Sequence, residues 1–348
     1  MAKVFLTGAK GQVGSELELE LLKEGYKVVS ATHISLDIAD TDRVLSAITA
    51  AEPQVVVNAA AFTNVERAEV DSSEAYSINA IGARNLAQAC AQLHIPLIHI
   101  SSDYVLDESS AGPHDEDAKT LGEKSGCVYG RTKLEGEKLI QASGCDYIIL
   151  RTSWVFGRFG RNFVKIMLSL AQERREIAVV KDQLGNPTPA RPLAKAIVEM
   201  VKQVQRKDFK AYGIYHYCGE ESTTWANFAR EIFKLAKQMH VLPHEVEVVP
   251  INSRDFKSKA QRPHDSRLSC PKLYSVFHMS QPRWQKFLPE VITSYVRECQ
   301  GLLPVEDYDN TITAFTEGTN IPEEKFLHPF TPKLDPEEVA NIGTKVEL

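Results

Sequence analysis

Tyr129 and Lys133 carry the pattern in this sequence that points most directly to chemistry. They lie in the run YGRTK, four residues apart, at the start of a segment with helical spacing. Residues at this separation face the same side of a helix. A neighbouring ammonium favours the phenolate, so it lowers the pKa of a tyrosine from its ordinary value of about 10 and makes the phenol a usable proton donor. Such pairs also arise by chance on helix surfaces, so the prediction depends on the residues around them.

Further polar and small residues follow two apolar runs that read as buried strands, residues 54–59 and 96–101. In ISSDYVLD the second run ends at Ser102, whose hydroxyl can hydrogen-bond a substrate carbonyl and stabilise the charge that develops on its oxygen. Small residues after the first run would let a nicotinamide ribose pass close to the backbone. The candidates at these two strand ends are Asn58, Ala59, Ala60, Ala61, Thr63, Ser102, Asp103 and Tyr104.

A glycine-rich turn lies between the first predicted strand and the first predicted helix. Its sequence, GAKGQVG, contains Gly8, Gly11 and Gly14 in the spacing GxxGxxG. Glycine allows a tight turn, a close approach to a pyrophosphate, and close packing of helix on strand. The helix N-terminus then presents free N–H groups to the phosphates, which makes Gln12 and Val13 binding candidates as well. We therefore predict a dinucleotide cofactor, NADPH or NADH.

The end of the second predicted strand does not decide between these two cofactors. A carboxylate there would bind the ribose 2′-OH of NADH, and an arginine would favour NADPH. The sequence has Thr32 and His33 at that place, and Asp37 with Ile38 a little later. We assign Asp37 and Ile38 to the adenine end, with a charge at a helix N-terminus as the other interpretation of Asp37.

Short apolar runs alternate with amphipathic segments over the first part of the chain. We expect strands at residues 3–7, 26–31, 54–59, 96–101 and 146–151, and helices at 15–24, 41–51, 72–93 and 129–143. The helix at 72–93 should have its N-cap at Ser72 or Ser73. Continuous apolar runs suit strands buried on both faces. The sequence thus predicts an α/β fold with a doubly wound parallel sheet, and a ligand crevice at the carboxyl ends of its strands.

The pattern becomes looser after about residue 150, where turn-rich segments alternate with helices expected at 192–205 and 224–239. We divide the chain into a dinucleotide-binding core at 1–155, a smaller substrate-binding lobe at 156–302 from which some chain returns to the core, and an irregular tail at 303–348. The tail is rich in Pro, Glu, Asp and Thr and could pack on a partner subunit.

Composition argues against several classes of partner. The formal net charge is −6, which gives no support for nucleic acid or an anionic membrane. No stretch reaches the roughly 18 apolar residues of a membrane span, and the N-terminus lacks the pattern of a secretory signal. The six cysteines form neither a CxxC pair nor a Cys/His cluster, so we expect no metal site and reduced thiols in a cytoplasmic protein.

An ordered set of motifs resembles one known family. GxxGxxG, NAA, a serine before a helix, and YxxxK together look like the extended short-chain dehydrogenases/reductases. VVVNAAAFTNVERAE, ISSDYVLD, YGRTKLEGE, LRTSWVFG, DQLGNPT and RPHDSRL resemble more narrowly the dTDP-4-dehydrorhamnose reductase family, over about residues 1–300. The resemblance implies a Rossmann-type fold and reduction of the C4 ketone of a dTDP-4-keto-6-deoxy sugar to give dTDP-L-rhamnose, in polysaccharide biosynthesis.

The same resemblance implies roles for individual residues. Tyr129 would give a proton to the C4 oxygen, Lys133 would hold the ribose and lower the pKa of the phenol, and Ser102 would position the carbonyl. The family commonly has threonine where this chain has Ser102. The residues at positions where the family binds its dTDP-sugar are Thr63, Val65, Ser102, Asp103, Tyr104, Trp154, Asn162 and Arg262, with Gln183 and Ser266 as weaker candidates. Trp154 could equally be a core residue.

Two loops depart from the family pattern. The chain has Leu106-Asp107-Glu108 where the family usually has glycine, and residues 124–128 where it usually has proline. We expect both loops near the substrate, which puts the identity of the sugar in question. Some relatives form dimers around a metal held by glutamates, and Glu16 could correspond to one of these; a homodimer is accordingly possible.

Two other functions remain open at this stage. One is reduction of a related dTDP-4-keto sugar, giving a 6-deoxytalose or a dihydrostreptose-type product. The other is a non-catalytic, NADP-binding regulatory subunit, against which the intact Tyr129, Lys133 and Ser102 argue. The sequence leaves the preference for NADH or NADPH, the sugar stereochemistry and the oligomeric state undecided.

Overall fold

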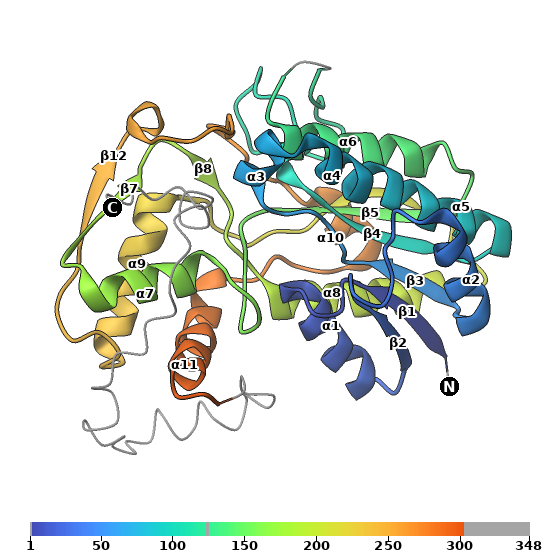
Figure 1. The fold of residues 1–348 in the computed structure, drawn as a ribbon, viewed down its shortest axis with the longest axis horizontal. Helices are drawn as coiled ribbons and strands as arrows, with labels where there is room; N and C mark the ends of the chain where they lie inside the picture. The colour runs from blue at the N-terminus through green and yellow to red at the C-terminus, as the bar shows by residue number, and fades with distance from the viewer. Residues whose placement is uncertain (1, 123–124, 303–348) are drawn as a thin grey trace.

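A computed structural model describes residues 2–122 and 125–302 of the chain. The tail expected at 303–348 therefore lies outside the described residues, and so does Lys124 of the second variant loop. Figure 1 shows two parts side by side, with a sheet flanked by helices on the right and a helical part on the left. No helix among the described residues is both long enough and apolar enough to cross a membrane.

Strands and helices alternate along the first half of the chain. The strands are β1 (Lys3–Thr7), β2 (Lys27–Ala31), β3 (Val55–Asn58), β4 (Leu97–Ser102), β5 (Tyr147–Thr152), β6 (Val155–Phe156), β7 (Glu176–Val180), β8 (Leu184–Gly185), β9 (Thr188–Pro189), β10 (Gly213–His216), β11 (Thr223–Thr224) and β12 (Glu247–Ile251). The helices are α1 (Gln12–Lys23), α2 (Thr41–Ala51), α3 (Val65–Val70), α4 (Ser72–Tyr76), α5 (Ala83–Leu93), α6 (Val128–Gln141), α7 (Phe163–Glu173), α8 (Ala190–Val204), α9 (Trp225–Gln238), α10 (Pro271–Phe277) and α11 (Leu288–Cys299). Short helical turns complete the set: η1 (Ser77–Gly82), η2 (Asp103–Val105), η3 (Ser253–Asp255) and η4 (Trp284–Phe287).

The main sheet has six parallel strands in the order β10-β5-β4-β3-β1-β2. The chain leaves β1 toward β2 on one side and then continues through β3 to β10 on the other. In such a sheet the ligand crevice forms where the winding reverses, outside the carboxyl ends of the strands. Thr7 of β1 and Asn58 of β3 are register partners at that point.

Helices cover both faces of the sheet, as the continuous apolar strands require. On β3, Val55 and Val57 join the core formed with α1 and α8, whereas Val56 points into the core formed with α2 and α5 (Figure 1). The alternation follows from the period of two in a strand. The predicted doubly wound α/β fold is confirmed.

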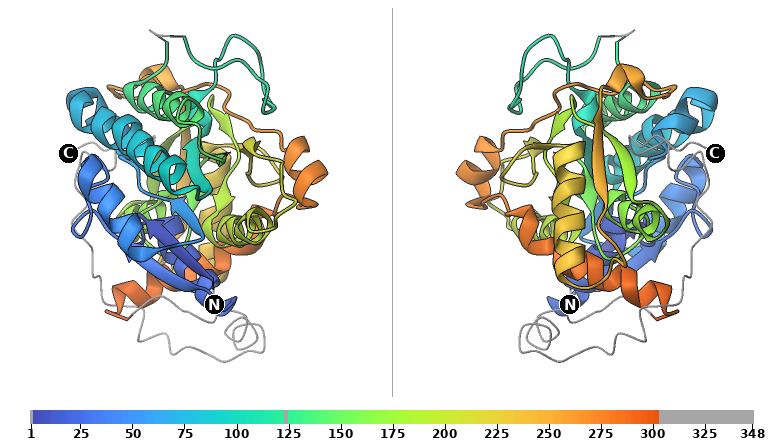
Figure 2. Two further views of the ribbon diagram at one scale, coloured as in Figure 1. Left: turned by 90° about the vertical axis from the view of Figure 1, so that its right-hand side faces the viewer. Right: turned by 90° about the vertical axis from the view of Figure 1, so that its left-hand side faces the viewer.

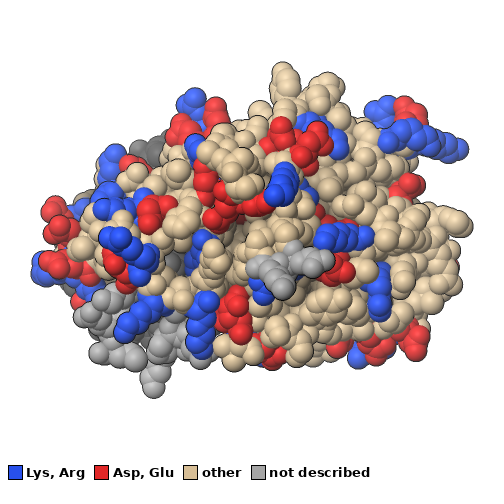
Figure 3. Space-filling model, turned by 90° about the horizontal axis from the view of Figure 1, so that it is seen from above, with Lys and Arg blue, Asp and Glu red and all other residues tan. Residues whose placement is uncertain are grey.

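A second apolar core lies outside the sheet. It is built from α7, α9 and α11, with β7 and β12 pairing in parallel beside them. Figure 2, right, shows α9 and β12 on the near side of this part. The chain does not stay there after residue 156, because α8 packs against α1 and β10 adds the sixth strand to the main sheet. Figure 3 shows acidic and basic side chains interspersed on the face seen from above.

The segment expected as one helix at 72–93 is interrupted. Asp71, not Ser72 or Ser73, caps it by accepting a hydrogen bond from the N–H of Glu74. After α4 the chain forms the π-helical turn η1 before α5 begins. In this turn the Asn79 side chain binds both backbone groups of Phe62, a tertiary contact that helical periodicity does not reveal. Turns of this kind occur often at functional sites.

Glu16 on α1 lies in a buried ion pair that joins the two parts of the molecule. Both its carboxylate and the guanidinium of Arg158 are fully buried, and Arg158 Nε donates to Glu16 Oε1 at 2.9 Å. The carbonyl of Arg158 in turn accepts from Ser294 Oγ of α11 at 2.8 Å. Glu16 is therefore engaged inside the chain. The described residues contain no group of three or more potential ligands that could hold a metal ion.

We expect the Glu16→Gln variant to lose about 3 kcal/mol or more of unfolding free energy, because the buried guanidinium loses its carboxylate partner. Urea denaturation measures this loss. The control is Glu231→Gln, whose exposed carboxylate lies 3.9 Å from Lys234 and should change stability by less than about 0.5 kcal/mol. Equal effects of the two substitutions would contradict a structural role for the buried pair.

Candidate active site

A large cavity, about 1340 Å³, opens at the carboxyl ends of β1, β3, β4 and β5 and extends to the second part of the molecule. It gathers residues that are far apart in the sequence. The predicted site residues that line it are Gly8, Gly11, Gln12, Val13, Asp37, Ile38, Ala59, Ala60, Ala61, Thr63, Val65, Ser102, Asp103, Tyr104, Tyr129, Lys133, Trp154, Asn162 and Arg262. Gly14, Asn58 and the weaker candidates Gln183 and Ser266 are absent from the lining.

The glycine turn brings the backbone of β1, β3 and α1 together. Gly8 has a φ of 69°, and a Cβ there would lie 2.5 Å from the backbone of Ala59 and Ala60. A Cβ on Gly14 would lie 2.0 Å from the Gly8 carbonyl oxygen, so Gly14 acts by packing the helix against the turn. Gly11 is the N-cap of α1 and no side chain caps this end. The first N–H groups of α1 therefore face the cavity, as an anion site requires.

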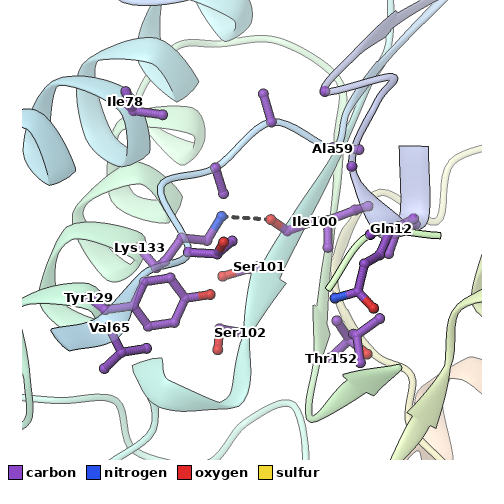
Figure 4. Close-up of a pocket in the computed structure, with 18 of the residues that line it drawn as sticks. Gln12, Ala59, Val65, Ile78, Ile100, Ser101, Ser102, Tyr129, Lys133 and Thr152 are labelled. Atoms are coloured by element: carbon purple, nitrogen blue, oxygen red, sulfur yellow. Dashed lines mark hydrogen bonds between the residues drawn. The ribbon is translucent and has the colours of Figure 1, made fainter. Parts of the chain in front are cut away.

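Two buried side-chain oxygens in the cavity support the fit of a polar ligand. Gln12 Oε1 and Thr152 Oγ1 have no hydrogen-bond partner among the described residues. Figure 4 shows Gln12 and Thr152 close together on one side of the cavity. Buried polar atoms are normally paired, so these atoms match a ligand that brings donors. Together with the glycine turn, they fit a dinucleotide laid across the ends of β1 and β3.

The loop after β2 lies at the far end of this cavity. Asp37 Oδ1 accepts the N–H of Ala39 at 2.9 Å, and the neighbouring Asp40, not Asp37, is the N-cap of α2. A Cβ on Gly82 would lie 2.5 Å from the Ile38 side chain, so the glycine in η1 leaves room for that side chain. Asp37 and Ile38 thus line the cavity.

Ser102, Tyr129 and Lys133 converge at the carboxyl end of β4. Tyr129 is in the first turn of α6, whose N-cap is Cys127, and Lys133 follows one turn later. Figure 4 shows the Tyr129 hydroxyl directed toward Ser101 and Ser102, and the Lys133 amine directed toward Ile100. Lys133 Nζ donates to the Ile100 carbonyl at 2.7 Å. The three side chains therefore approach one region of the cavity from two elements.

Burial moves the ionisable groups of this trio toward their neutral forms. It raises the pKa of Tyr129 above its ordinary value, while the hydrogen bond with Ser102 works in the opposite direction. Burial lowers the pKa of Lys133 to about 8, although the charge of Glu137 acts to raise that pKa. The expectation that Lys133 lowers the pKa of Tyr129 is not supported, because Ser102 is the group that opposes the effect of burial. A neutral phenol is nevertheless the form that can donate a proton.

Asp103 links Ser102 to the substrate side of the cavity. Ser102 Oγ donates to Asp103 Oδ1 at 2.9 Å and accepts from the N–H of Tyr104 at 3.2 Å. Burial raises the pKa of Asp103 to about 6, although hydrogen bonds from Ser266 and Ser102 oppose this effect. The ring of Tyr104 meets that of Tyr129 edge-on, with centroids 5.5 Å apart. The serine hydroxyl is thus held in a fixed direction from both sides.

The remaining predicted substrate residues lie around the opening toward the second part. Trp154 has a φ of 44° and stacks on Trp225 with ring centroids 3.5 Å apart. Arg262 pairs with Glu66 of α3 at 2.8 Å, which ties the late segment to the cavity rim. Asn162 caps α7 and donates Nδ2 to the Gly157 carbonyl at 2.8 Å, so its amide also serves the fold.

Some residues of the cavity were not predicted from the sequence. Thr152 and Ser153 end β5, where the argument from strand ends applies equally, so the run LRTSW held the necessary signal. Trp225 begins α9, far from every motif, and no pattern pointed to it. Gln183 and Ser266 lie outside the large cavity; Gln183 lines a smaller one, of about 600 Å³, that shares Arg262 with it.

The two loops that depart from the family pattern do not line the large cavity in the described residues. Asp107 is held by Lys119 at 2.8 Å, and Glu108 Oε1 accepts the N–H of His264 at 3.0 Å. Cys127 packs with Val65 and Tyr129, so the second loop reaches the cavity through these side chains. The described residues of both loops therefore lie outside the lining of the large cavity, and the expectation that the loops lie near the substrate stays a prediction.

The order of the parallel strands, with a Tyr/Lys pair on the helix that follows β4, is the arrangement of the extended short-chain dehydrogenases/reductases, and the fold assigns the chain to this class. The sequence profile of the RmlD substrate binding domain matches residues 2–297. The chain therefore belongs to this family, as the motifs predicted.

Individual relatives agree with this assignment. The dTDP-4-dehydrorhamnose reductase of Aggregatibacter actinomycetemcomitans is 38% identical over 292 residues, which cover 84% of this chain and 98% of that protein. The spore coat polysaccharide biosynthesis protein SpsK of Bacillus subtilis is 37% identical, over 77% of this chain and 89% of its own. Among solved structures, a dTDP-4-dehydrorhamnose reductase of Bacillus anthracis in complex with NADP is 34% identical, with a TM-score of 0.77 over 84% of this chain and 99% of its own.

The buried carboxyl of Asp103 should make stability depend on pH. Its pKa is about 6 in the folded chain, whereas an aspartate ordinarily has a pKa of 3.8, which we take for the unfolded chain. As the pH rises, the carboxyl of the unfolded chain therefore ionises first. Wild type should therefore lose about 2 kcal/mol relative to Asp103→Asn between pH of about 4 and about 7. Urea denaturation of both proteins at the two pH values measures this difference.

An exposed aspartate provides a control of opposite sign. The ion pair with Arg206 lowers the pKa of Asp208, so wild type should gain stability relative to Asp208→Asn as the pH rises. If the stability difference between wild type and Asp103→Asn were the same at both pH values, Asp103 would not be a buried acid of raised pKa.

Proposed function

We propose that this chain uses NADPH or NADH to reduce the C4 ketone of dTDP-4-dehydro-L-rhamnose, giving dTDP-L-rhamnose. The observation that carries the proposal is the convergence of Ser102, Tyr129 and Lys133 in one cavity next to the glycine turn. That cavity, about 1340 Å³, exceeds the roughly 300–1000 Å³ of ordinary ligand pockets, which suits two ligands bound together. Membership of the family and the names of its relatives support the same activity.

The cofactor would lie across the ends of β1 and β3. Gly8, Gly11 and the N–H groups of Gln12 and Val13 would hold its pyrophosphate, while Gly14 keeps α1 close to the turn. The small Ala59-Ala60-Ala61 run lets the backbone pass close to the ribose that carries the nicotinamide, with Lys133 on its other side. Asp37 and Ile38 line the adenine end. Bound in this way, the reduced nicotinamide supplies a hydride to the carbonyl carbon.

The residues of this chain supply the proton and fix the carbonyl. The Tyr129 hydroxyl is directed toward Ser102 and hydrogen-bonds it, so one carbonyl oxygen can meet both groups. As negative charge develops on that oxygen, Ser102 turns its hydroxyl proton from Asp103 toward it, and Tyr129 gives it a proton. Burial keeps the phenol protonated at neutral pH, since it raises the pKa of Tyr129.

The substrate would occupy the side of the cavity toward the second part of the molecule. Val65 and the stacked Trp154 offer apolar surface, which suits the C6 methyl group of a 6-deoxy sugar better than a hydroxymethyl group. Thr63 and Asp103 provide polar groups for the sugar hydroxyls. We assign Arg262, a basic side chain that lines the same cavity as Asn162, to the diphosphate.

We also propose a cytoplasmic location and a homodimer. Six free cysteines, five of them buried, suit a reducing compartment. The homodimer remains a prediction, which sedimentation of the full chain tests. A related dTDP-4-keto sugar as substrate would yield a different product, so product stereochemistry distinguishes it from the proposal.

The assay generates dTDP-4-dehydro-L-rhamnose in situ and follows oxidation of NADPH and of NADH by absorbance. We expect wild type to form dTDP-L-rhamnose, and Tyr129→Phe to lower kcat by about 10²–10⁴-fold while NADPH still binds, because only the proton donor is removed. A Tyr129→Phe variant as active as wild type would refute the assigned role. NADPH binding without turnover in wild type would favour the regulatory function.

Ser102 offers a matched pair of substitutions. Ser102→Ala removes the hydroxyl at the carbonyl and should lower kcat by about 10²–10³-fold. Ser102→Thr keeps the hydroxyl, so it should retain activity within about tenfold of wild type, as expected from families with threonine at this position. If alanine and threonine reduced kcat equally, the effect would come from packing and not from the hydroxyl.

A further inference from the structure

Lys133 is the last member of a buried polar chain that runs beneath the site across the sheet. The chain begins at Thr7 of β1, passes through Asn58 of β3 and His99 of β4, and reaches Lys133 of α6. Each of these side chains is exposed by only 1%. Their polar atoms therefore meet one another and not water, so the direction of each hydrogen bond is constrained by its neighbours.

Asn58 has one possible orientation. Its Oδ1 atom accepts from the N–H of Ala60 at 3.0 Å and from Thr7 Oγ1 at 2.6 Å. A backbone N–H can only donate, so turning the amide would place two donors against each other. Nδ2 of Asn58 therefore faces His99 Nδ1, at 2.9 Å. Because an amide nitrogen can only donate, His99 Nδ1 must accept and carries no proton.

The proton of His99 is consequently on Nε2. A neutral imidazole carries one proton, and here only Nε2 is free to hold it. Burial is the main cause that holds the pKa of His99 well below its ordinary value, so the ring is neutral even when Lys133 carries no charge. Nε2 lies 3.2 Å from Lys133 Nζ. A hydrogen bond from Nε2–H to Nζ needs a lone pair on the lysine, which an amine has and an ammonium lacks.

We infer that Asn58 and His99 form a relay of hydrogen-bond direction that favours the neutral amine of Lys133, and that His99 is thereby a positioning residue for the proposed reduction. When Lys133 is protonated, its ammonium and the Nε2–H of His99 are two donors that face each other, so the contact becomes unfavourable. The relay thus acts in the same direction as burial. The opposing influence is Glu137, one turn further along α6, which is itself paired with Arg151 of β5 at 2.7 Å. Tyr129 on α6 is neutral.

The inference rests on the proposed function for the role of Lys133 in the reduction, but its test needs no sugar substrate. The first arm is nitrogen NMR of wild type labelled at histidine. His216 provides an internal contrast, because its Nδ1 faces the carbonyls of His114 and Ser269 at 3.2 and 3.1 Å and must hold the proton. We expect His99 as the Nε2–H tautomer and His216 as the Nδ1–H tautomer. An Nδ1–H tautomer at His99 would overturn the inference.

The second arm is the pH dependence of NADPH binding, followed by nicotinamide fluorescence. His99→Leu removes the Nε2–H donor, so the pH at which Lys133 changes the affinity should rise by about one pH unit, or roughly tenfold in proton concentration. His114→Leu is the matched control, because this buried histidine contacts Asp265 and not Lys133; its pH profile should equal that of wild type. Equal profiles for wild type and His99→Leu would overturn the inference.

The two arms remain separate from the proposed activity. If the tautomer and the shifted binding profile are found but no keto-sugar is reduced, the relay stands and the proposed function fails. If His99→Leu does not fold, the tautomer measured in wild type decides alone.

Discussion

The reversal of winding between β1 and β3 is the constraint on which the rest of the structure depends. Because the chain crosses to opposite sides of the sheet after these strands, no connection covers the carboxyl ends of β1, β3 and β4. Every group of the site is placed by this edge: the glycine turn after β1, the alanines after β3 and Ser102 at the end of β4. The second part of the molecule closes over the edge, and the buried pair of Glu16 with Arg158 holds the two together.

Burial, more than charge, sets the chemistry at this edge. It raises the pKa of Tyr129 and of Asp103 and lowers that of Lys133, so acids and bases alike move toward their neutral forms. A site with few fixed charges stabilises a developing alkoxide by oriented hydrogen bonds, which need no ionised partner. A chain of net charge −6 still offers a place for an anion at the start of α1, where no side chain caps the backbone N–H groups.

The sequence was sufficient for the fold and for about half of the lining of the cavity, because both depend on local signals. Continuous apolar runs, a glycine turn and residues at strand ends are visible without knowledge of tertiary contacts. It was insufficient for the π-helical turn at 77–82, which depends on Asn79 reaching Phe62, and for Trp225, which reaches the cavity only because α9 packs behind Trp154. The pKa of Tyr129 was also misjudged, since spacing indicates which residues are close but not how deeply they are buried.

Hydrogen-bond direction is a further property that no motif carries. His99 and His216 are both buried histidines on neighbouring parts of one sheet, and burial lowers the pKa of each, that of His216 to about 3. Composition and burial would treat them alike. Their neighbours differ: an amide nitrogen that can only donate faces Nδ1 of His99, whereas two carbonyl oxygens that can only accept face Nδ1 of His216. The two rings must therefore hold their protons on opposite nitrogens, and only His99 presents its proton to the lysine of the site.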